Sequence, residues 1–414
     1  MDDKNWMMEA LKHLSRIGRT GQDGSNRLAF TKEDAEARAY FKGLMTESGL
    51  AVREDAFGNI IGRLEGSEPG LAAVATGSHL DTVPNGGHYD GMAGCAASLA
   101  AVRSLRRRGT LRRPLEVIVF QMEESSRFSL ATFGSKVMAG KADLDLARRA
   151  KDKEGISLPD AMRAQGYDFE ALPRAGRKKG ELACFVEMHI EQSPILEEKG
   201  LPVGIVTAIA APIRSRVEIT GKASHSGSTV MNNRLDALVT AADLVLAVRA
   251  VGNRFSRREI VATVGNLVVR PGAMNVVPGG AELWIDLRGT SREAMDEAQA
   301  AILKAAEGLA AKHGMPVVFH PLGADDPVRM TPGIVDLMGE ASRDLRIPST
   351  PIVSGAGHDT MNMAALGEVG MIFVRNRDGL SHHHEEYAAP EDLMSGLDLL
   401  TETLYRLAMR AEGS

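Results

Sequence analysis

The chain has 414 residues, more than a single hydrophobic core usually supports, so we expect two domains. Its 44% hydrophobic and 25% charged residues are typical of a soluble globular protein, and no apolar stretch approaches a membrane span in length. A formal charge of −5 and an aromatic content of 4% argue against nucleic-acid binding, which needs a basic face and stacking side chains. The acidic N-terminus lacks the basic start and apolar run of a signal peptide, so we expect a cytoplasmic protein.

Residues 1–212 predict alternating helices and strands, the pattern of a layered α/β domain. Amphipathic stretches near 32–49 and 92–108 predict helices, and the apolar runs at 71–78, 115–122 and 184–188 predict strands. The stretch 141–182 is rich in charge and glycine and predicts a partly helical surface excursion. Cys95 and Cys184 have small or apolar neighbours, which favours buried free thiols over a disulfide.

From about residue 213 the order of the elements changes. The pattern predicts β-α-β-β-α-β, the order of a ferredoxin-like unit that can close as its own domain. The predicted elements are a strand at 216–220, a helix over 233–251, strands at 261–269 and 281–288, a helix over 291–313 and a strand at 316–320. After residue 326 the helix–strand alternation resumes, with a strand at 371–374. We therefore expect a domain at 213–326 inserted into an α/β domain formed by 1–212 and 327–414.

Each of the four apolar runs in the α/β domain ends near side chains that bind metal ions. Because the carboxyl ends of parallel strands face one crevice, residues far apart in sequence converge there. The converging set mixes imidazoles and carboxylates, which suits Zn²⁺, Mn²⁺, Co²⁺ or Ni²⁺. Four such segments predict a dinuclear metal site, with candidates at His79, Asp81, Asp90, Glu123, Glu124, His189 and the run His382, His383 and His384.

The residues after the first of these strands have separable roles. His79 is a candidate ligand, and Asp81, on the same side of an extended chain, can orient its imidazole. Taken alone, this pair is weakly specific, and a surface histidine is the alternative. Asp90 is the candidate bridging ligand because a carboxylate has two oxygens, whereas an imidazole has one free lone pair. Capping the helix at 92–108 is the alternative role for Asp90.

Glu123 and Glu124 are adjacent at a strand end and therefore point in different directions. We assign Glu124 to metal binding and Glu123 to proton transfer from water to a leaving nitrogen. Solvated surface charge is the alternative for this pair. Gln192, shortly after His189, could bond an amide or ureido group of a substrate or be an ordinary loop residue. Spacing leaves open which of the three histidines at 382–384 is a ligand.

Six motifs occur in one order along the chain: GSHLDTVPNGGHYDG at 77–91, EESSRF at 123–128, EMHIEQ at 187–192, ASHSGSTVM at 223–231, SGAGHD at 354–359 and SHHHEEY at 381–387. Together they resemble the hydantoinase/carbamoylase amidases of the M20 metallopeptidase clan. That branch includes N-carbamoyl-L-amino-acid hydrolases, β-ureidopropionases and allantoate amidohydrolases. The resemblance implies a layered metallopeptidase-like catalytic domain with an inserted ferredoxin-like α+β lid and dimerisation domain. It also implies a homodimer with two divalent ions per subunit (Zn, Mn, Co or Ni).

Residue by residue, the resemblance makes His79, Asp90 and His189 ligands of one metal ion. It makes Asp90, Glu124 and His382 ligands of the other, which selects His382 from its run. Glu123 matches the general base, and His225 matches a residue that stabilises the oxyanion in the partner subunit's site. The implied substrate contacts are Gln192, Asn275, Arg288, Gly357 and His358. Asn275 and Arg288 would hold a substrate carboxylate, which arginine can pair with two parallel hydrogen bonds.

The chain departs from the family pattern at several positions on the substrate side. His88 replaces a usual asparagine, Ser125 replaces a glycine, and His383 and His384 replace Asn-Pro. The stretches 211–215 and 224–230 also differ from the usual sequences. No metal ligand is lost, so the departures leave the substrate open rather than the reaction class.

We therefore expect a dinuclear metal-dependent amidohydrolase that cleaves a linear C–N bond of N-carbamoyl-L-amino acids or related ureido acids, releasing ammonia and CO₂. The alternatives are an allantoate amidohydrolase, an amidase for another N-acyl amino acid, and a non-catalytic binding protein, since fold alone does not guarantee activity. The expected partners are a small ureido or N-carbamoyl acid and a second copy of the chain, with no nucleic acid and no membrane.

Overall fold

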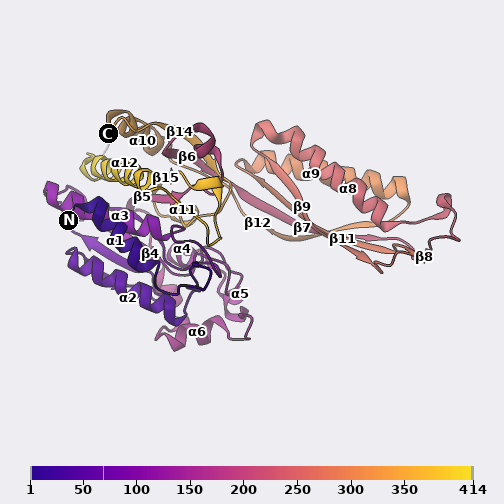
Figure 1. The fold of residues 1–414 in the computed structure, drawn as a ribbon, viewed down its shortest axis with the longest axis horizontal. Helices are drawn as coiled ribbons and strands as arrows, with labels where there is room; N and C mark the ends of the chain where they lie inside the picture. Colours follow the sequence, from indigo (N-terminus) through magenta and orange to yellow (C-terminus); the bar gives the residue numbers. More distant parts are fainter. Residues whose placement is uncertain (1, 69, 412–414) are drawn as a thin grey trace. The chain divides into compact units, whose positions relative to one another are not determined.

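The computed structural model describes residues 2–68 and 70–411, which form two compact units. The first unit runs to Thr207 and resumes at Met330, and the second comprises Ala208–Arg329 (Figure 1). The second unit therefore interrupts the first in sequence. The sequence pattern predicts the inserted domain at 213–326, a few residues shorter at each end.

The first unit contains most of a nine-stranded mixed sheet, counted over the described residues, in the order β1-β2-β4-β3-β5-β15-β6-β13, with β14 paired to β6. Neighbours among β4, β3, β5 and β15 run parallel, and β2 pairs antiparallel with β4. The parallel strands therefore end at one edge of the sheet. The strand bounds are β1 Ala51–Glu54, β2 Ile60–Leu64, β3 Ala73–His79, β4 Leu115–Phe120, β5 Leu182–Ile190, β6 Val203–Ile209, β13 Val328–Arg329, β14 Ser349–Ser354 and β15 Glu368–Val374.

The sheet centre is buried on both faces, because every residue of β3 and β4 is buried. One apolar cluster joins α1, α2, α3, α10 and α12 to the sheet, and a second gathers phenylalanines around α4, α6 and η1. Cys95 and Cys184 lie buried as free thiols, as predicted. The helices are α1 Asp3–Leu14, α2 Lys32–Glu47, α3 Met92–Arg108, α4 Phe133–Met138, α5 Leu144–Arg149, α6 Leu158–Ala164, η1 Phe169–Ala175, α7 Ile195–Lys199, α10 Pro332–Asp344, α11 Thr360–Met363, η4 Arg377–Gly379 and α12 Pro390–Met409.

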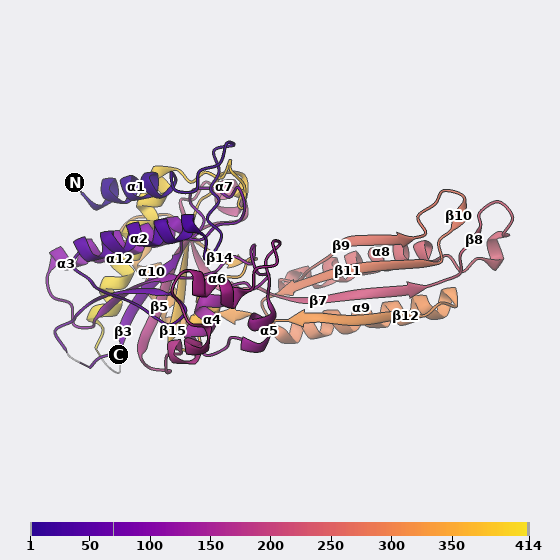
Figure 2. The ribbon, with the colours of Figure 1, turned by 90° about the horizontal axis from the view of Figure 1, so that it is seen from below.

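The second unit has a four-stranded antiparallel sheet in the order β12-β7-β11-β9, and α8 and α9 pack on it (Figure 2). A short separate pair joins β8 to β10. The elements are β7 Ala211–Thr220, β8 Ser224–His225, η2 Met231–Asn233, α8 Ala237–Phe255, η3 Ser256–Arg258, β9 Val261–Arg270, β10 Val276–Val277, β11 Gly280–Gly289, α9 Arg292–His313 and β12 Val317–Ala324. Its main elements therefore follow the chain order β-α-β-β-α-β.

Two predicted elements begin elsewhere than expected. The strand predicted at 216–220 already begins at Ala211, since residues at alternate positions are buried from there while Arg214 is exposed. The helix predicted from residue 233 begins at Ala237, because the Asp236 side chain accepts the backbone N–H groups of Leu238 and Val239. None of the helices within 2–68 and 70–411 is long and apolar enough to cross a membrane.

The fully buried Arg27 connects the N-terminal segment to the end of β3 through hydrogen bonds. The Arg27 Nε donates to the carbonyl oxygen of Leu80 at 3.1 Å, and its Nη1 donates to those of Leu14 and Ile17 at 3.2 and 2.9 Å. Burial lowers the pKa of Arg27 to about 10, which leaves the guanidinium charged at neutral pH. Because Leu80 follows His79 directly, this anchor supports the chain that leaves β3.

Replacing Arg27 by methionine should therefore reduce the free energy of unfolding by at least about 3 kcal/mol, because three carbonyl groups lose a charged donor and only that of Leu14 keeps a second described donor, the Ile17 N–H. Denaturant unfolding measures this loss. Arg19 provides the control, because the one partner of its exposed side chain among the described residues is Asp23, and Arg19→Met should cost less than about 0.5 kcal/mol. A loss below about 1 kcal/mol in Arg27→Met would show that water replaces the guanidinium.

Candidate metal centre

The ends of parallel strands bring the predicted metal-binding residues together in the first unit. His79 is the last residue of β3, and His189 lies near the end of the neighbouring β5. Asp90 stands just before α3, while Glu124 follows β4. His382 lies in the loop between β15 and α12, about 190 residues after His189 in sequence.

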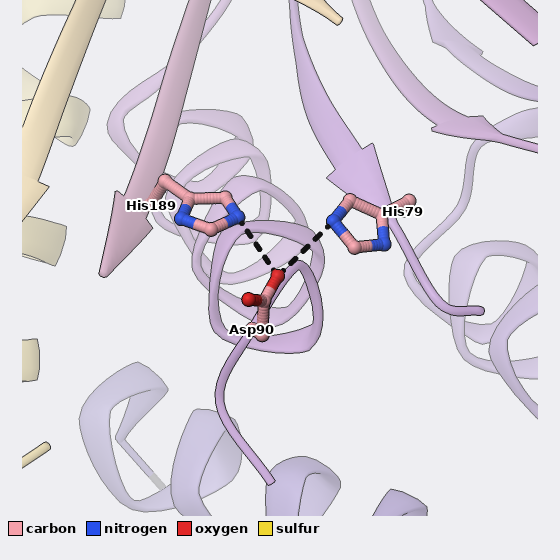
Figure 3. Close-up of side chains that lie close together, drawn as sticks. All are labelled: His79, Asp90 and His189. Carbon is pink, nitrogen blue, oxygen red and sulfur yellow. Dashed lines mark ion pairs between the residues drawn. The ribbon is translucent and has the colours of Figure 1, made fainter. Parts of the chain in front are cut away.

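The first donor group consists of His79, Asp90 and His189, all buried (Figure 3). Asp90 Oδ1 lies 3.3 Å from His79 Nε2 and 3.2 Å from His189 Nε2. Ligand atoms that share one Zn²⁺ at about 2.0–2.1 Å in a tetrahedron are about 3.3–3.4 Å apart. Both distances therefore fit a common metal ion, and the three ligand atoms all lie within 4.8 Å of one another.

The second donor group consists of Asp90, Glu124 and His382. His382 Nε2 lies 3.2 Å from Glu124 Oε1 and 3.5 Å from Asp90 Oδ2. The two groups therefore use different oxygens of Asp90, as a bridging carboxylate requires. The His382 side chain is 50% exposed, whereas that of Asp90 is 10% exposed, so the second group lies nearer to solvent.

The electrostatics of the cluster reflect an excess of buried carboxylates. Burial alone would raise the pKa of Asp90, but His189 and His79 outweigh it and hold the pKa well below its usual value. Contact with Glu124 raises the pKa of His382 to about 9. Burial also raises the pKa of Asp81 to about 7 and that of Asp359 to about 8. Cations at the two donor groups would relieve this excess, which supports the fit of the residues to metal ions.

Glycine at position 91 allows the close approach of α3 to the first donor group. A Cβ atom at Gly91 would lie 2.5 Å from the His79 ring, and the φ of +66° is a conformation that other residues rarely adopt. A side chain here would push the imidazole away from Asp90.

Asp81 differs from the expectation in how it supports the site. The nearest acceptor for His79 Nδ1 is the main-chain oxygen of Asp81 at 3.0 Å, whereas its carboxylate oxygen lies at 3.7 Å. The carboxylate instead accepts the backbone N–H groups of Glu123 and Glu124 at 3.2 and 3.0 Å. Asp81 thus links the end of β3 to the chain after β4.

Glu123 and Glu124 point to different neighbours, as their adjacent positions predict. Glu124 Oε1 faces His382, while Glu123 Oε2 lies 3.9 Å from His79 Nε2. Burial raises the pKa of Glu123 well above its usual value, and His79 opposes the shift. Only one of the pair therefore belongs to a donor group.

Gln192 and His358 line the same cluster. Gln192 Nε2 donates to Asp90 Oδ2 and Ser381 Oγ at 3.2 and 3.1 Å, while its buried Oε1 has no hydrogen-bond partner among the described residues. The His358 ring packs 4.6 Å from the His189 ring, between their centroids, and burial, followed by His189, lowers the pKa of His358 well below its usual value. His358 is therefore neutral at physiological pH, and the exposed Gly357 precedes it.

The second unit contains three candidate site residues, of which two lie close together and the third lies elsewhere. His225 and Asn275 are neighbours, since Val276 pairs with His225 and the Asn275 carbonyl accepts the Ser226 N–H. Arg288 lies near the other end of β11, where it pairs with Pro212. It is eight residues from Gly280, the first residue of β11, which corresponds to about 26 Å of extended strand. Asn275 and Arg288 of one chain are therefore separated by more than the length of an amino-acid-sized substrate.

Hydrogen bonds to nearby residues orient the side chains of His225 and Arg288. His225 Nδ1 accepts the backbone N–H groups of Gly227 and Ser228 at 3.0 and 3.2 Å, so its proton lies on Nε2 in the neutral ring. Arg288 donates through Nε and Nη2 to the two carboxylate oxygens of Asp286 at 2.8 and 3.3 Å.

Sequence reasoning missed two residues that contact Asp90. Ser381 Oγ donates to Asp90 Oδ2 at 2.6 Å. Glu386 accepts the backbone N–H groups of Tyr89 and Asp90. Both lie in the SHHHEEY motif, at the ends of the run of three histidines, and membership of this motif is the sequence signal that could have identified them.

Residues 75–406 match the peptidase family M20/M25/M40. The chain is 39% identical to an N-carbamoyl-L-amino acid amidohydrolase of Geobacillus stearothermophilus over 97% of this chain and 98% of the relative. It is 38% identical to a ureidoglycolate hydrolase of Oryza sativa subsp. japonica over 99% of this chain and 85% of the relative. A crystal structure of an amidase of the hydantoinase/carbamoylase family from Burkholderia multivorans matches with a TM-score of 0.91 at 32% identity, covering 98% of each chain.

Proposed function

Because the chain belongs to the peptidase family M20/M25/M40, among its hydantoinase/carbamoylase amidases, it is a hydrolase of C–N bonds other than peptide bonds, and we propose that its substrates are N-carbamoyl-L-amino acids or related ureido acids. The resemblance read from the sequence motifs is thus confirmed. In the carbamoyl case one water and one substrate molecule give ammonia, CO₂ and the free amino acid.

The observation that carries this proposal is the pair of donor groups that share Asp90, with the unpartnered Gln192 Oε1 beside them. Enzymes of the family depend on metals, and His79, Asp90 and His189 would hold one ion while Asp90, Glu124 and His382 would hold another. Such ions act as Lewis acids that polarise the scissile carbonyl and acidify water. Gln192 Oε1 can accept an N–H of the ureido group, which a simple ester does not offer.

We assign proton transfer to Glu123. Its carboxylate accepts a proton from the attacking water and then delivers it to the leaving nitrogen as the C–N bond breaks. The Glu123 backbone N–H is bonded to Asp81, which fixes the start of the side chain next to His79. His225 Nε2–H would donate to the oxyanion that forms at the carbonyl oxygen.

The function proposed for His225 and Arg288 requires a homodimer. These residues lie at opposite ends of the second unit, so both can reach one substrate only if they come from different copies. Exposed apolar side chains on α8 and the edge strand β9 support a two-fold contact there, and they include Val239, Leu246, Val261 and Val268. We propose that His225 and Asn275 of one copy complete the site of the other.

The test of the proposed function is a substrate screen after reconstitution with Mn²⁺, Co²⁺, Ni²⁺ or Zn²⁺. Ammonia release should be fastest from N-carbamoyl-L-amino acids, release of the free amino acid from N-acyl amino acids should be slower, and both should be absent after chelation. Faster release from ureidoglycolate or allantoate would instead identify the second candidate function, which the similarity to a ureidoglycolate hydrolase favours. Protein that binds metal but hydrolyses none of these compounds would contradict the proposal.

Arg288→Lys should raise KM while changing kcat less, because lysine keeps the charge but loses the planar fork that pairs with a carboxylate. Substrate amides that lack the carboxylate should lose less activity than the matching acids. Steady-state kinetics on an acid and its amide measures the difference. If both respond alike, Arg288 does not bind the carboxylate.

A further inference from the structure

The loop that carries His382 is bonded to the bridging ligand at both of its ends. On one side of His382, Ser381 Oγ donates to Asp90 Oδ2 at 2.6 Å. On the other side, Glu386 Oε1 accepts the backbone N–H groups of Tyr89 and Asp90 at 2.8 and 2.9 Å. His382 lies between these two connections, with a left-handed φ of 60° that a side chain rarely adopts without support.

Glycine at position 87 makes room for the Glu386 carboxylate. A Cβ atom at Gly87 would lie 2.4 Å from Cβ, Cδ and Oε1 of Glu386. The backbone of Gly87 is not in the left-handed region, so the requirement for glycine here is the close approach alone. The side chain and the glycine thus form one contact between the loop before α3 and the loop after β15.

The two donor groups depend on this contact to different degrees. His79 and His189 lie on strands, and Asp90 is also held by the start of α3, where the Met92 N–H bonds to its carbonyl oxygen. His382 lies in the loop between β15 and α12, eight residues past the end of β15, and its side chain is half exposed. Loss of the Glu386 contact would therefore loosen the second donor group more than the first.

We infer that Glu386, with Gly87, is a positioning residue that sets the distance between His382 and Asp90 and so builds the second metal site. This inference rests on the proposed two-ion centre. Glu386 itself belongs to neither donor group and acts through two backbone N–H groups. Outer contacts of this kind typically change metal affinity by about 10–100-fold.

The test is metal binding by the purified full-length protein, measured as ions per subunit after dialysis and as two dissociation constants from competition with a chromogenic chelator. Wild-type protein should hold two ions. Glu386→Ala should weaken one site about 10–100-fold and leave the other within about threefold. Glu386→Gln should stay close to wild type, because its amide oxygen can accept the same two N–H groups and Glu386 Oε2 has no partner among the described residues.

Gly87→Ala should weaken the same site, and the double variant Gly87→Ala/Glu386→Ala should be no weaker than the worse single variant, because both changes remove one contact. Asp392→Asn is the control for general destabilisation, since this buried carboxylate pairs with Arg375 and neither residue belongs to a donor group. It should lower the unfolding temperature and keep two ions.

The outcomes separate this inference from the proposed function. Wild-type protein that binds no ion or one ion would overturn the two-ion centre itself. Two ions in wild type, with unchanged affinities in Glu386→Ala, would overturn the positioning role. Equal weakening of both sites would also overturn it, because the contact would then support Asp90 rather than the distance to His382.

Discussion

Replacing Glu123 by glutamine is expected to lower kcat by at least about 10²-fold while both metal ions stay bound, because glutamine cannot accept a proton from water. Glu123 belongs to neither donor group, and its carboxylate oxygen lies 3.9 Å from His79 Nε2, beyond direct hydrogen-bond contact. The change keeps the shape of the side chain and removes its capacity to accept a proton. Steady-state kinetics and metal analysis of the same preparation measure both effects.

Glu124→Gln is the matched control, because the neighbouring carboxylate faces His382 at 3.2 Å within the second donor group. It should lose metal and lose activity in proportion, and added metal should restore part of the activity. Equal metal loss in the two variants would show that both glutamates bind metal and that another group moves the proton.

His225→Ala is expected to lower kcat by about 10²–10³-fold, the usual loss when one oxyanion donor is removed. If His225 acts in the partner's site, mixing this variant with Glu123→Gln should restore activity that neither has alone. Half of freely reassorted dimers are hybrids with one intact site, so recovery should approach about a quarter of wild-type activity.

Subunit exchange must be demonstrated for this experiment, for example with two affinity tags on one recovered dimer. Hybrids as inactive as their parents would then place the action of His225 within its own subunit. Ser228→Ala offers a control, because its side chain is not needed for the backbone N–H that fixes the His225 ring.

The convergence of the candidate metal ligands could be predicted from sequence because most of them stand at the end of an apolar run. The runs before His79, Glu124 and His189 became β3, β4 and β5, and parallel pairing brought their ends together. The mixed α/β fold followed from the same alternation. His382 is different, because three consecutive histidines have no distinguishing period and only the family motif selected one of them.

Contacts through the main chain could not be predicted in this way. Asp81 bonds to two backbone N–H groups rather than closely to an imidazole, and Glu386 does the same for the loop of Asp90. Such bonds depend on the path of the backbone and leave no side-chain pattern. The separation of Asn275 from Arg288, by contrast, follows from the strand predicted at 281–288, which extends between them as β11.

The interruption of the first unit by the second has a consequence for how the centre assembles as the chain is synthesised. His79, Asp90 and His189 have all been translated before the second unit begins at Ala208, so a ribosome-bound chain already carries the residues of one donor group. His382 follows only after that unit has been made. The residues of the first donor group are therefore complete before those of the second, and a chain halted within the second unit would carry a single complete donor set.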